Sequence, residues 1–211
     1  MARVWQMIAI VDYGRGNLGS VEKAFARVGM DAVVTQDPRV VADSEAVVLP
    51  GDGAFHDAML SLEALGLLGP VRLVLEGGRP FLGICLGYQL LFSESEEFGQ
   101  GPGLDLIRGV VRRFPKGLKV PHMGWNQVEH AGDLAIFDGI PSGAYFYFVH
   151  SYYPEALDGT LRVATCTYGV TFPAAIGKGN LFATQFHPEK SQRWGLKLIE
   201  NFAAFVRGAR R

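Results

Sequence analysis

The feature that most constrains the fold is a regular alternation of β-type and helical segments in the first half of the chain. Short apolar, β-branched runs predict buried strands at residues 7–11, 31–34, 46–49 and 80–84. Amphipathic patterns predict helices at 18–29, 69–78 and 86–92. Strand–helix–strand units need parallel strands joined by right-handed crossovers. The alternation therefore predicts an α/β fold with a doubly wound, mostly parallel sheet.

The second half of the chain has a different pattern of predicted elements. Strand-like segments follow one another closely, at 110–114, 125–130, 144–150, 161–168, 171–177 and 181–187. Turns such as residues 177–180 join them. We expect an antiparallel extension of the same domain, closed by an amphipathic helix at 194–208, and a solvated acidic loop at 93–103. The chain of 211 residues shows no repeat or linker, so a single domain spanning 1–211 is expected.

The composition gives no support to nucleic-acid or membrane binding. The chain is 48% hydrophobic and 19% charged with a formal net charge of -1, whereas both partners call for a basic excess. No apolar run approaches the ~20 residues that span a bilayer. The first residues lack the apolar stretch and cleavage site of a signal peptide. We expect a cytoplasmic protein.

The two cysteines, Cys85 and Cys166, lie in different kinds of sequence. Cys166 falls in the strand-like segment 161–168 and is expected to be buried packing. Without a C-x-x-C pair, no structural zinc or other metal site is expected. The count allows a disulfide between the two, but a cytosolic setting argues against it.

Cys85 lies where a predicted strand turns into a predicted helix, between Gly83 and Gly87. A G-x-nucleophile-x-G turn of this kind is a nucleophile elbow, and its small residues let strand and helix approach. The turn lifts the sulfur above the carboxyl edge of the sheet. There a helix N-terminus favours the thiolate, and the N–H of Leu86 faces a developing oxyanion. On this motif alone, a buried cysteine in a tight turn explains the pattern equally well.

A general base for that cysteine is available in the sequence 186–191, where His187 ends an apolar strand and Glu189 follows two positions later. Residues i and i+2 of an extended segment face the same side, and Pro188 biases His187 toward an extended conformation. Glu189 can then hold the imidazole in one tautomer. Cys85, His187 and Glu189 form a candidate triad of nucleophile, base and orienting group. The alternative is a simple turn that closes a strand.

Two glycine-rich loops follow strands. Residues 50–53, Pro-Gly-Asp-Gly, can present backbone N–H groups of Asp52 and Gly53 as the second half of an oxyanion hole, although alone they are merely a turn. Residues 14–19 fit G-x-G-x-x-G, with Asp37 about 20 positions on, as in dinucleotide sites. We favour a tight turn or a partner contact there, because a thiol triad gives a nicotinamide no task. No cofactor is expected.

Together these motifs resemble class I glutamine amidotransferases, on residues 83–87, 50–53 and 187–189. Segments 12–17, 121–126, 145–153 and 186–191 resemble more narrowly the glutaminase subunits of imidazole glycerol phosphate synthases. The resemblance implies that Cys85 attacks the carboxamide of glutamine, that Leu86 and the 51–53 segment hold the oxyanion, and that His187 protonates the departing ammonia and then activates water.

The resemblance also implies substrate contacts and a partner. The glutamine contacts would be Gly51, Gln89, His150, Ser151 and Tyr152. Ammonia would pass to a (β/α)8-barrel cyclase subunit that makes imidazole glycerol phosphate and an aminoimidazole carboxamide ribotide in histidine biosynthesis. Positions matching that interface are Asn17, Trp125, Tyr147 and Lys190, each of which is otherwise an ordinary surface or core residue.

Two positions depart from the family pattern. Asp52 replaces a usual valine, and because a carboxylate facing the oxyanion would oppose it, we expect this side chain to face solvent or the partner. Tyr88 replaces a commoner methionine, with only a packing consequence expected. The resemblance further implies weak glutaminase activity until the partner binds its ligand.

Two other functions fit the same elbow chemistry or the same fold. One is a cysteine peptidase or γ-glutamyl hydrolase, against which segments 12–17 and 121–126 argue. The other is a non-catalytic regulatory module, against which the intact Cys85, His187 and Glu189 argue. A peptide substrate separates the first, and covalent labelling by a glutamine-analogue electrophile separates the second.

Overall fold

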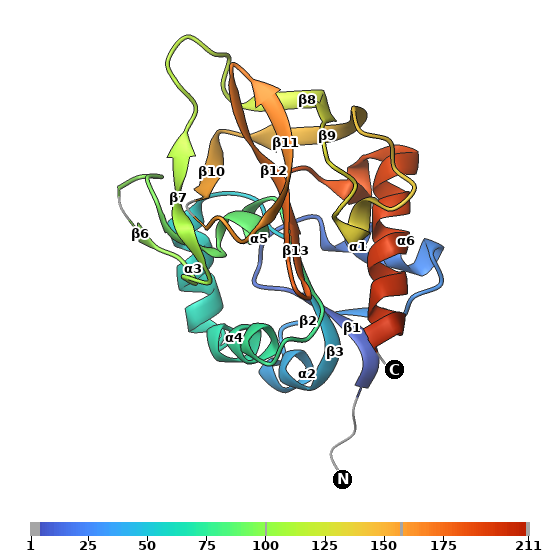
Figure 1. The fold of residues 1–211 in the computed structure, drawn as a ribbon. Coiled ribbons are helices and arrows are strands. Elements are labelled where there is room, and N and C mark those ends of the chain that lie inside the picture. The colour runs from blue at the N-terminus through green and yellow to red at the C-terminus, as the bar shows by residue number, and fades with distance from the viewer. Residues whose placement is uncertain (1–4, 100, 157, 210–211) are drawn as a thin grey trace.

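The computed structural model describes residues 5–99, 101–156 and 158–209, and its centre is a seven-stranded sheet (Figure 1). Five strands are parallel, in the order β13 (Leu181–Thr184), β4 (Phe81–Ile84), β3 (Ser44–Leu49), β1 (Trp5–Val11) and β2 (Ala32–Thr35). Antiparallel strands β12 (Val170–Lys178) and β11 (Arg162–Tyr168) continue the sheet beyond β13. The predicted doubly wound, mostly parallel sheet with an antiparallel extension is confirmed.

Helices cover both faces of this sheet. Side chains of α1 (Leu18–Arg27) and α6 (Gln192–Ala209) belong to one hydrophobic core, and those of α2 (Pro38–Asp43), α3 (Phe55–Ala64) and α4 (Leu68–Glu76) to a second. Strand β1 contributes to both cores, because Ile8 and Ile10 face the first and Ala9 and Val11 the second. A strand buried on both faces has a continuous apolar sequence, which is the pattern that predicted it.

The remaining strands form two smaller sheets rather than one extension. One has the order β10 (Tyr152–Ala156), β7 (Ile107–Arg113), β5 (Phe92–Ser95) and β6 (Gly101–Pro102). The other pairs β8 (His122–Val128) with β9 (Ala144–His150), at the top of Figure 1. The short helices are α5 (Leu86–Gln89), η1 (Ala135–Phe137) and η2 (Pro188–Lys190).

Two expectations around the elbow were wrong. The helix expected over 86–92 ends at Gln89, because the apolar residues after it enter strand β5, where Phe92 pairs with Ile107 of β7. The segment 93–103, expected to be a solvated loop, contains part of β5 and all of β6. Its Ser95 is buried. Residue 100 lies outside the described residues.

Helices α2 and α3 and strand β10 were not predicted. Helix α2 has only six residues, starting with Pro38 after the capping side chain of Asp37. Helix α3 has no side-chain cap at its preceding residue; instead a carboxylate oxygen of Glu97 accepts from the N–H of Phe55 at 2.7 Å. A cap supplied from 42 residues away leaves no local signal in the sequence.

No single helix among residues 5–99, 101–156 and 158–209 is long and apolar enough to cross a bilayer. Helices α3 and α4 reach that length and composition only as a pair, and they are bent by 97° at their junction.

Candidate active site

Cys85 occupies the sharp turn between β4 and α5, with φ 53° and ψ -106°. A non-glycine residue in this region of φ/ψ space is strained and needs support from its surroundings. The flanking glycines allow close packing: a Cβ on Gly87 would lie 1.8 Å from the carbonyl oxygen of Leu49 in β3, and one on Gly83 would lie 2.9 Å from the carbonyl oxygen of Gly87. Both positions therefore require glycine for the turn to form.

The sulfur of Cys85 opens into a cavity of about 420 Å³ at the carboxyl end of the parallel strands. Only 6% of the residue is exposed. Helix α5 behind it has four residues, so the helix dipole expected to favour the thiolate is small. The dipole of this short helix therefore contributes little to the electrostatic environment of the sulfur.

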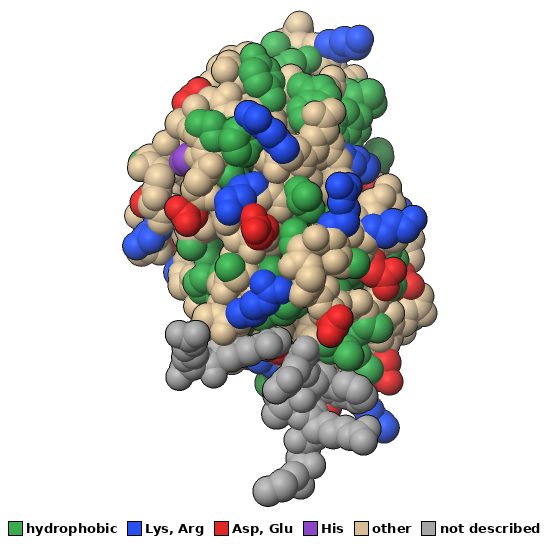
Figure 2. Space-filling model, turned by 90° about the vertical axis from the view of Figure 1, so that its right-hand side faces the viewer, with side chains coloured by type: hydrophobic (Ala, Val, Ile, Leu, Met, Phe, Trp, Pro, Cys, Tyr) green, Lys and Arg blue, Asp and Glu red, His purple; other side chains and the backbone are tan. Residues whose placement is uncertain are grey.

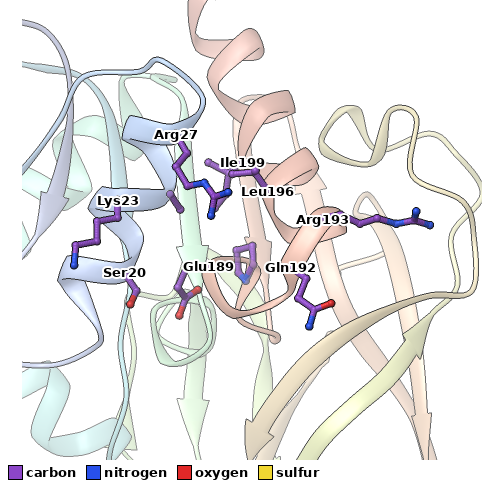
Figure 3. Close-up of a pocket in the computed structure, with 10 residues that line it drawn as sticks. Ser20, Lys23, Arg27, Glu189, Gln192, Arg193, Leu196 and Ile199 are labelled. Atoms are coloured by element: carbon purple, nitrogen blue, oxygen red, sulfur yellow. The ribbon is translucent and has the colours of Figure 1, made fainter.

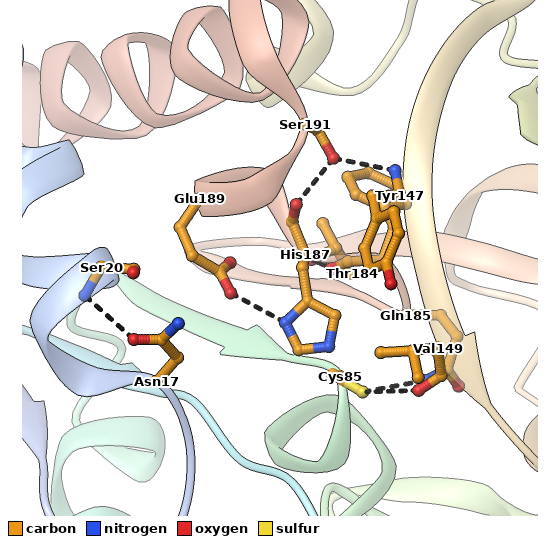
Figure 4. Close-up of polar contacts among 11 residues, drawn as sticks. Asn17, Ser20, Cys85, Tyr147, Val149, Thr184, Gln185, His187, Glu189 and Ser191 are labelled. Carbon is orange, nitrogen blue, oxygen red and sulfur yellow. Dashed lines mark hydrogen bonds and ion pairs between the residues drawn. The ribbon is translucent and has the colours of Figure 1, made fainter. Parts of the chain in front are cut away.

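His187 and Glu189 are in contact, since Nδ1 of the imidazole lies 2.8 Å from Oε1 of the carboxylate. Residues 188–190 form a 3₁₀ turn, so it is this turn, and not the extended alternation expected from the sequence, that brings Glu189 back to the ring. In Figure 4 the other edge of the imidazole faces Cys85. Its Nε2 is buried without a hydrogen-bond partner among the described residues, which leaves it available to the thiol proton.

The backbone of His187 is held in place from both sides. Its N–H donates to the carbonyl oxygen of Tyr147 in β9 at 3.0 Å, and its own carbonyl accepts from the hydroxyl of Ser191 at 2.6 Å (Figure 4). The same hydroxyl accepts from the N–H of Tyr147 at 2.9 Å. These contacts fix the position of the base relative to the elbow.

The charge state of His187 depends on its two neighbours. Burial alone would lower its pKa, but the charge of a Cys85 thiolate and the hydrogen bond and charge of Glu189 outweigh burial and raise the pKa to about 10. These contacts favour the imidazolium form of His187.

The 50–53 loop lies directly against the elbow. A Cβ added to Gly51 would meet Leu86 Cβ at 3.0 Å and the Gly87 nitrogen at 3.3 Å, and it would lie 2.0 Å from the hydroxyl of Tyr13. The loop is thus close enough to Leu86 for both to donate backbone N–H groups to one oxyanion. Asp52 is exposed at the rim of the cavity, which fits the expectation that its carboxylate faces solvent or a partner.

Four of the five predicted substrate contacts line the same cavity: Gln89, His150, Ser151 and Tyr152. The fifth, Gly51, is not among the lining residues, which do include the predicted oxyanion residues Asp52, Gly53 and Leu86. Gln89 Nε2 donates to the carbonyl oxygen of Tyr152 at 2.9 Å and to Oε1 of Gln185 at 3.0 Å. Both of its protons are therefore used inside the protein. Its own Oε1 is the atom left to accept from a ligand.

His150 belongs to a chain of neutral rings behind the cavity. Its Nδ1 donates to the carbonyl oxygen of Tyr152 at 2.8 Å, so its Nε2 accepts from Nδ1 of His122 at 2.9 Å. The far nitrogen of His122 then accepts from Asn126 at 3.2 Å. Burial lowers the pKa of His150 to about 3 and that of His122 to about 4, so both rings are uncharged at neutral pH.

The four residues proposed for a partner interface occupy different elements, and two of them are in contact. Lys190 lines the cavity itself, and Asn17 caps α1 by accepting from the N–H of Ser20 at 3.3 Å. Trp125 is 45% exposed on β8 and makes an edge contact with Tyr147 on β9.

Tyr88 was expected to have only a packing role. Its buried hydroxyl also donates a hydrogen bond to the carbonyl oxygen of Pro173 at 3.3 Å.

Sequence reasoning missed two polar side chains that belong to the site. Glu97 lines the cavity, and burial raises the pKa of its carboxyl group. Gln185, fully buried two residues before His187, donates from Nε2 to the sulfur of Cys85 at 3.7 Å. Glu97 lay in a segment taken for a loop, and nothing in a single sequence distinguishes Gln185 from an ordinary strand residue.

The 14–19 glycine motif has a structural task in this fold. A Cβ on Gly16 would lie 3.3 Å from the nitrogen of Gly51, so the motif packs against the 50–53 loop. Asp37, the acid of the dinucleotide pattern, caps α2 by accepting from the N–H of Arg39 at 2.8 Å. Both features that suggested NAD thus have packing and capping roles here.

A second cavity, of about 580 Å³, lies between α1 and α6 on the other side of Glu189 and is lined by Lys23, Arg27 and Arg193, among others (Figure 3).

Over the part of the chain that the structure describes, no cluster of three or more His, Cys, Asp or Glu side chains has a metal-binding arrangement. Cys85 and Cys166 are both free thiols, and burial raises the pKa of Cys166 to about 12.

The fold and the thiol site define a class of protein: residues 9–205 match the model of the family described as glutamine amidotransferase class-I, and the chain belongs to this family. Its curated relatives narrow the class. The chain is 54% identical over 202 residues to "Imidazole glycerol phosphate synthase subunit HisH" of Moorella thermoacetica, covering 96% of each chain. It is 55% identical to the protein of that name from Syntrophotalea carbinolica, covering 93% of this chain and 98% of the relative.

Solved structures share the fold at much lower sequence identity. The crystal structure of a glutamine amidotransferase aligns with a TM-score of 0.74 at 20% identity, covering 94% of this chain and 98% of the other. PurLQS from Thermotoga maritima aligns with a TM-score of 0.72 at 16% identity, covering 98% of this chain and 99% of the other. These likenesses support the fold assignment alone.

Proposed function

We propose that this chain is the glutamine-hydrolysing subunit of an imidazole glycerol phosphate synthase, acting in histidine biosynthesis. The observation that carries the proposal is that Cys85 and His187 line one cavity and Glu189 contacts the imidazole from outside it, in a chain about half identical to such subunits over nearly its full length. The protein would work in the cytoplasm as a single amidotransferase domain.

In the proposed reaction, His187 takes the thiol proton through Nε2, and the Cys85 thiolate attacks the carboxamide carbon of glutamine. The N–H of Leu86 and one N–H of the 51–53 segment hold the tetrahedral oxyanion. The imidazolium gives its proton to the leaving nitrogen, so ammonia departs and a thioester remains. His187 then removes a proton from water, whose attack releases glutamate and restores the thiol.

The polar groups of the cavity suit a free amino acid better than a peptide. Glu97 offers a carboxylate and Gln89 a carbonyl oxygen, and both are acceptors for the α-ammonium group of glutamine. A peptide bond at that nitrogen would remove the charge that Glu97 attracts. This argues against the cysteine peptidase alternative.

The ammonia would pass to a (β/α)8-barrel cyclase subunit, because release to water converts it to unreactive ammonium. A docking surface for that partner fits the β8–β9 ribbon, where Met123, Trp125 and Tyr145 are between 45% and 62% exposed. Figure 2 shows hydrophobic side chains gathered over the upper part of the molecule, the end that carries β8 and β9 in Figure 1. Exposed apolar clusters of this kind mark interaction surfaces.

The test is a glutaminase assay of the chain mixed with its cyclase partner in the presence of the ribotide ligand. We expect stimulated glutamate release from the wild type and a loss of about 10³-fold or more in Cys85→Ala, as for removal of a covalent nucleophile. Cys166→Ala, which removes the other thiol and does not alter a residue that lines the cavity, is the matched control and should keep its activity. A mild loss in Cys85→Ala, or cleavage of peptides in preference to glutamine, would contradict the proposal.

A further inference from the structure

The sulfur of Cys85 carries a negative charge when it attacks glutamine, and the polar groups around it affect how well that charge is stabilised. Helix α5 is too short for a strong dipole. One neighbour of the sulfur, the carbonyl oxygen of Val149 at 4.0 Å, accepts from the thiol and repels the thiolate. Besides the imidazole of His187, the sulfur has a further polar neighbour that can donate, the side-chain amide of Gln185, at 3.7 Å (Figure 4).

The orientation of the Gln185 amide follows from its partners. The carbonyl oxygen of Tyr152 accepts only, so the atom of Gln89 that faces it is Nε2. That same nitrogen is 3.0 Å from Gln185, so the facing atom of Gln185 must be its oxygen. The remaining end, Nε2 with its two protons, therefore points at Cys85. The carbonyl oxygen of Tyr152 thus fixes the orientation of the Gln89 amide, which in turn fixes that of the Gln185 amide with its N–H group toward the sulfur.

Gln185 is also rigidly placed. It is fully buried, and its backbone N–H donates to the carbonyl oxygen of Ala174 in β12 at 2.7 Å. A donor held in a buried site is worth more to an anion than one in water, since it needs no reorganisation when charge appears.

We propose that Gln185 is a further catalytic residue, which donates a hydrogen bond from Nε2 to the Cys85 thiolate and so increases the thiolate fraction available for attack on glutamine. The inference deepens the proposed glutaminase function, on which its catalytic part rests. His187 holds the proton that leaves the sulfur, while Gln185 stabilises the charge left behind. Gln89 then has two tasks, since the amide that presents an oxygen to the substrate also orients Gln185.

The experiment follows the pH dependence of Cys85 alkylation by iodoacetamide in the full chain, with the Cys85 peptide quantified by mass spectrometry. Gln185→Glu keeps an oxygen toward Gln89 but replaces the donor at sulfur by an acceptor, and Gln185→Met removes the donor at similar volume. We expect the alkylation midpoint to rise by about one pH unit or more in either variant, because the lost N–H group donates to the charged form of the sulfur. The kcat for glutamine should fall roughly tenfold or more with the complexed partner present, with KM little changed.

Gln127→Glu, on the exposed strand β8, is the matched control and should leave the alkylation midpoint unchanged. Circular dichroism establishes whether each variant is folded. If Gln185→Glu does not fold, Gln185→Met still provides the test. A midpoint within a few tenths of a unit of the wild type in a folded variant would overturn the inference. If the midpoint shifts while the wild type fails to hydrolyse glutamine, the thiolate contact stands and the proposed function falls.

Discussion

At the residue scale, the properties of the candidate base come from its neighbours and not from its own chemistry. Burial opposes a charge on His187, yet the Cys85 thiolate and Glu189 raise its pKa to about 10. We predict that Cys85→Ala lowers the pKa of His187 markedly. Burial lowers this pKa, and without the sulfur only Glu189 remains to raise it. An NMR titration of the imidazole protons measures this shift. Cys166→Ala should leave that pKa unchanged, and an unchanged value in Cys85→Ala would mean that the two side chains do not interact.

At the scale of elements, the elbow depends on the close approach of α5 to β3. The Gly87→Ala change puts a methyl group 1.8 Å from the carbonyl oxygen of Leu49, a backbone atom with strands on either side. We predict a loss of about 3 kcal/mol or more in the free energy of unfolding, as for severe overpacking, measured by denaturant titration. Gly69→Ala in α4 meets no atom within 4 Å and should gain about 0.5–1 kcal/mol. Equal effects of the two changes would refute this account of the elbow.

At the scale of the whole molecule, the buried pair of His122 and His150 makes stability depend on pH. Their pKa values are about 4 and about 3 in the folded protein, against roughly 6.5 when unfolded. Between these limits the unfolded chain binds more protons at these two sites, so their contribution to the free energy of unfolding is complete above pH 6.5 and is lost as the pH drops toward 4. Denaturant titrations at pH 7, 6 and 5 check this.

The control for this pH dependence uses a surface histidine. His56 is exposed on α3, so His56→Asn should keep the wild-type fall in stability, whereas His122→Phe should lessen it. An acid sensitivity that persists in full in a folded His122→Phe variant would assign the effect to other groups.

Much of the architecture was readable from local patterns. Apolar runs identified the parallel strands around β1, and the glycines on either side of Cys85 identified the elbow, because these signals arise from neighbouring residues and hydrogen bonds within one turn. The pairing of His187 with Glu189 was also predicted, although a 3₁₀ turn produces it and not the extended geometry expected.

The sequence by itself determined the order of strands and helices, the strained cysteine and the residue types available for a thiol mechanism. Only the tertiary structure decided which distant groups meet them: Glu97 capping α3 from 42 residues away, β5 forming where a helix end was expected, and Gln185 turned toward the sulfur by the carbonyl of Tyr152. The physical reason is that a backbone turn is selected by adjacent residues. The direction of a buried amide is selected by whichever donors and acceptors the folded chain brings around it.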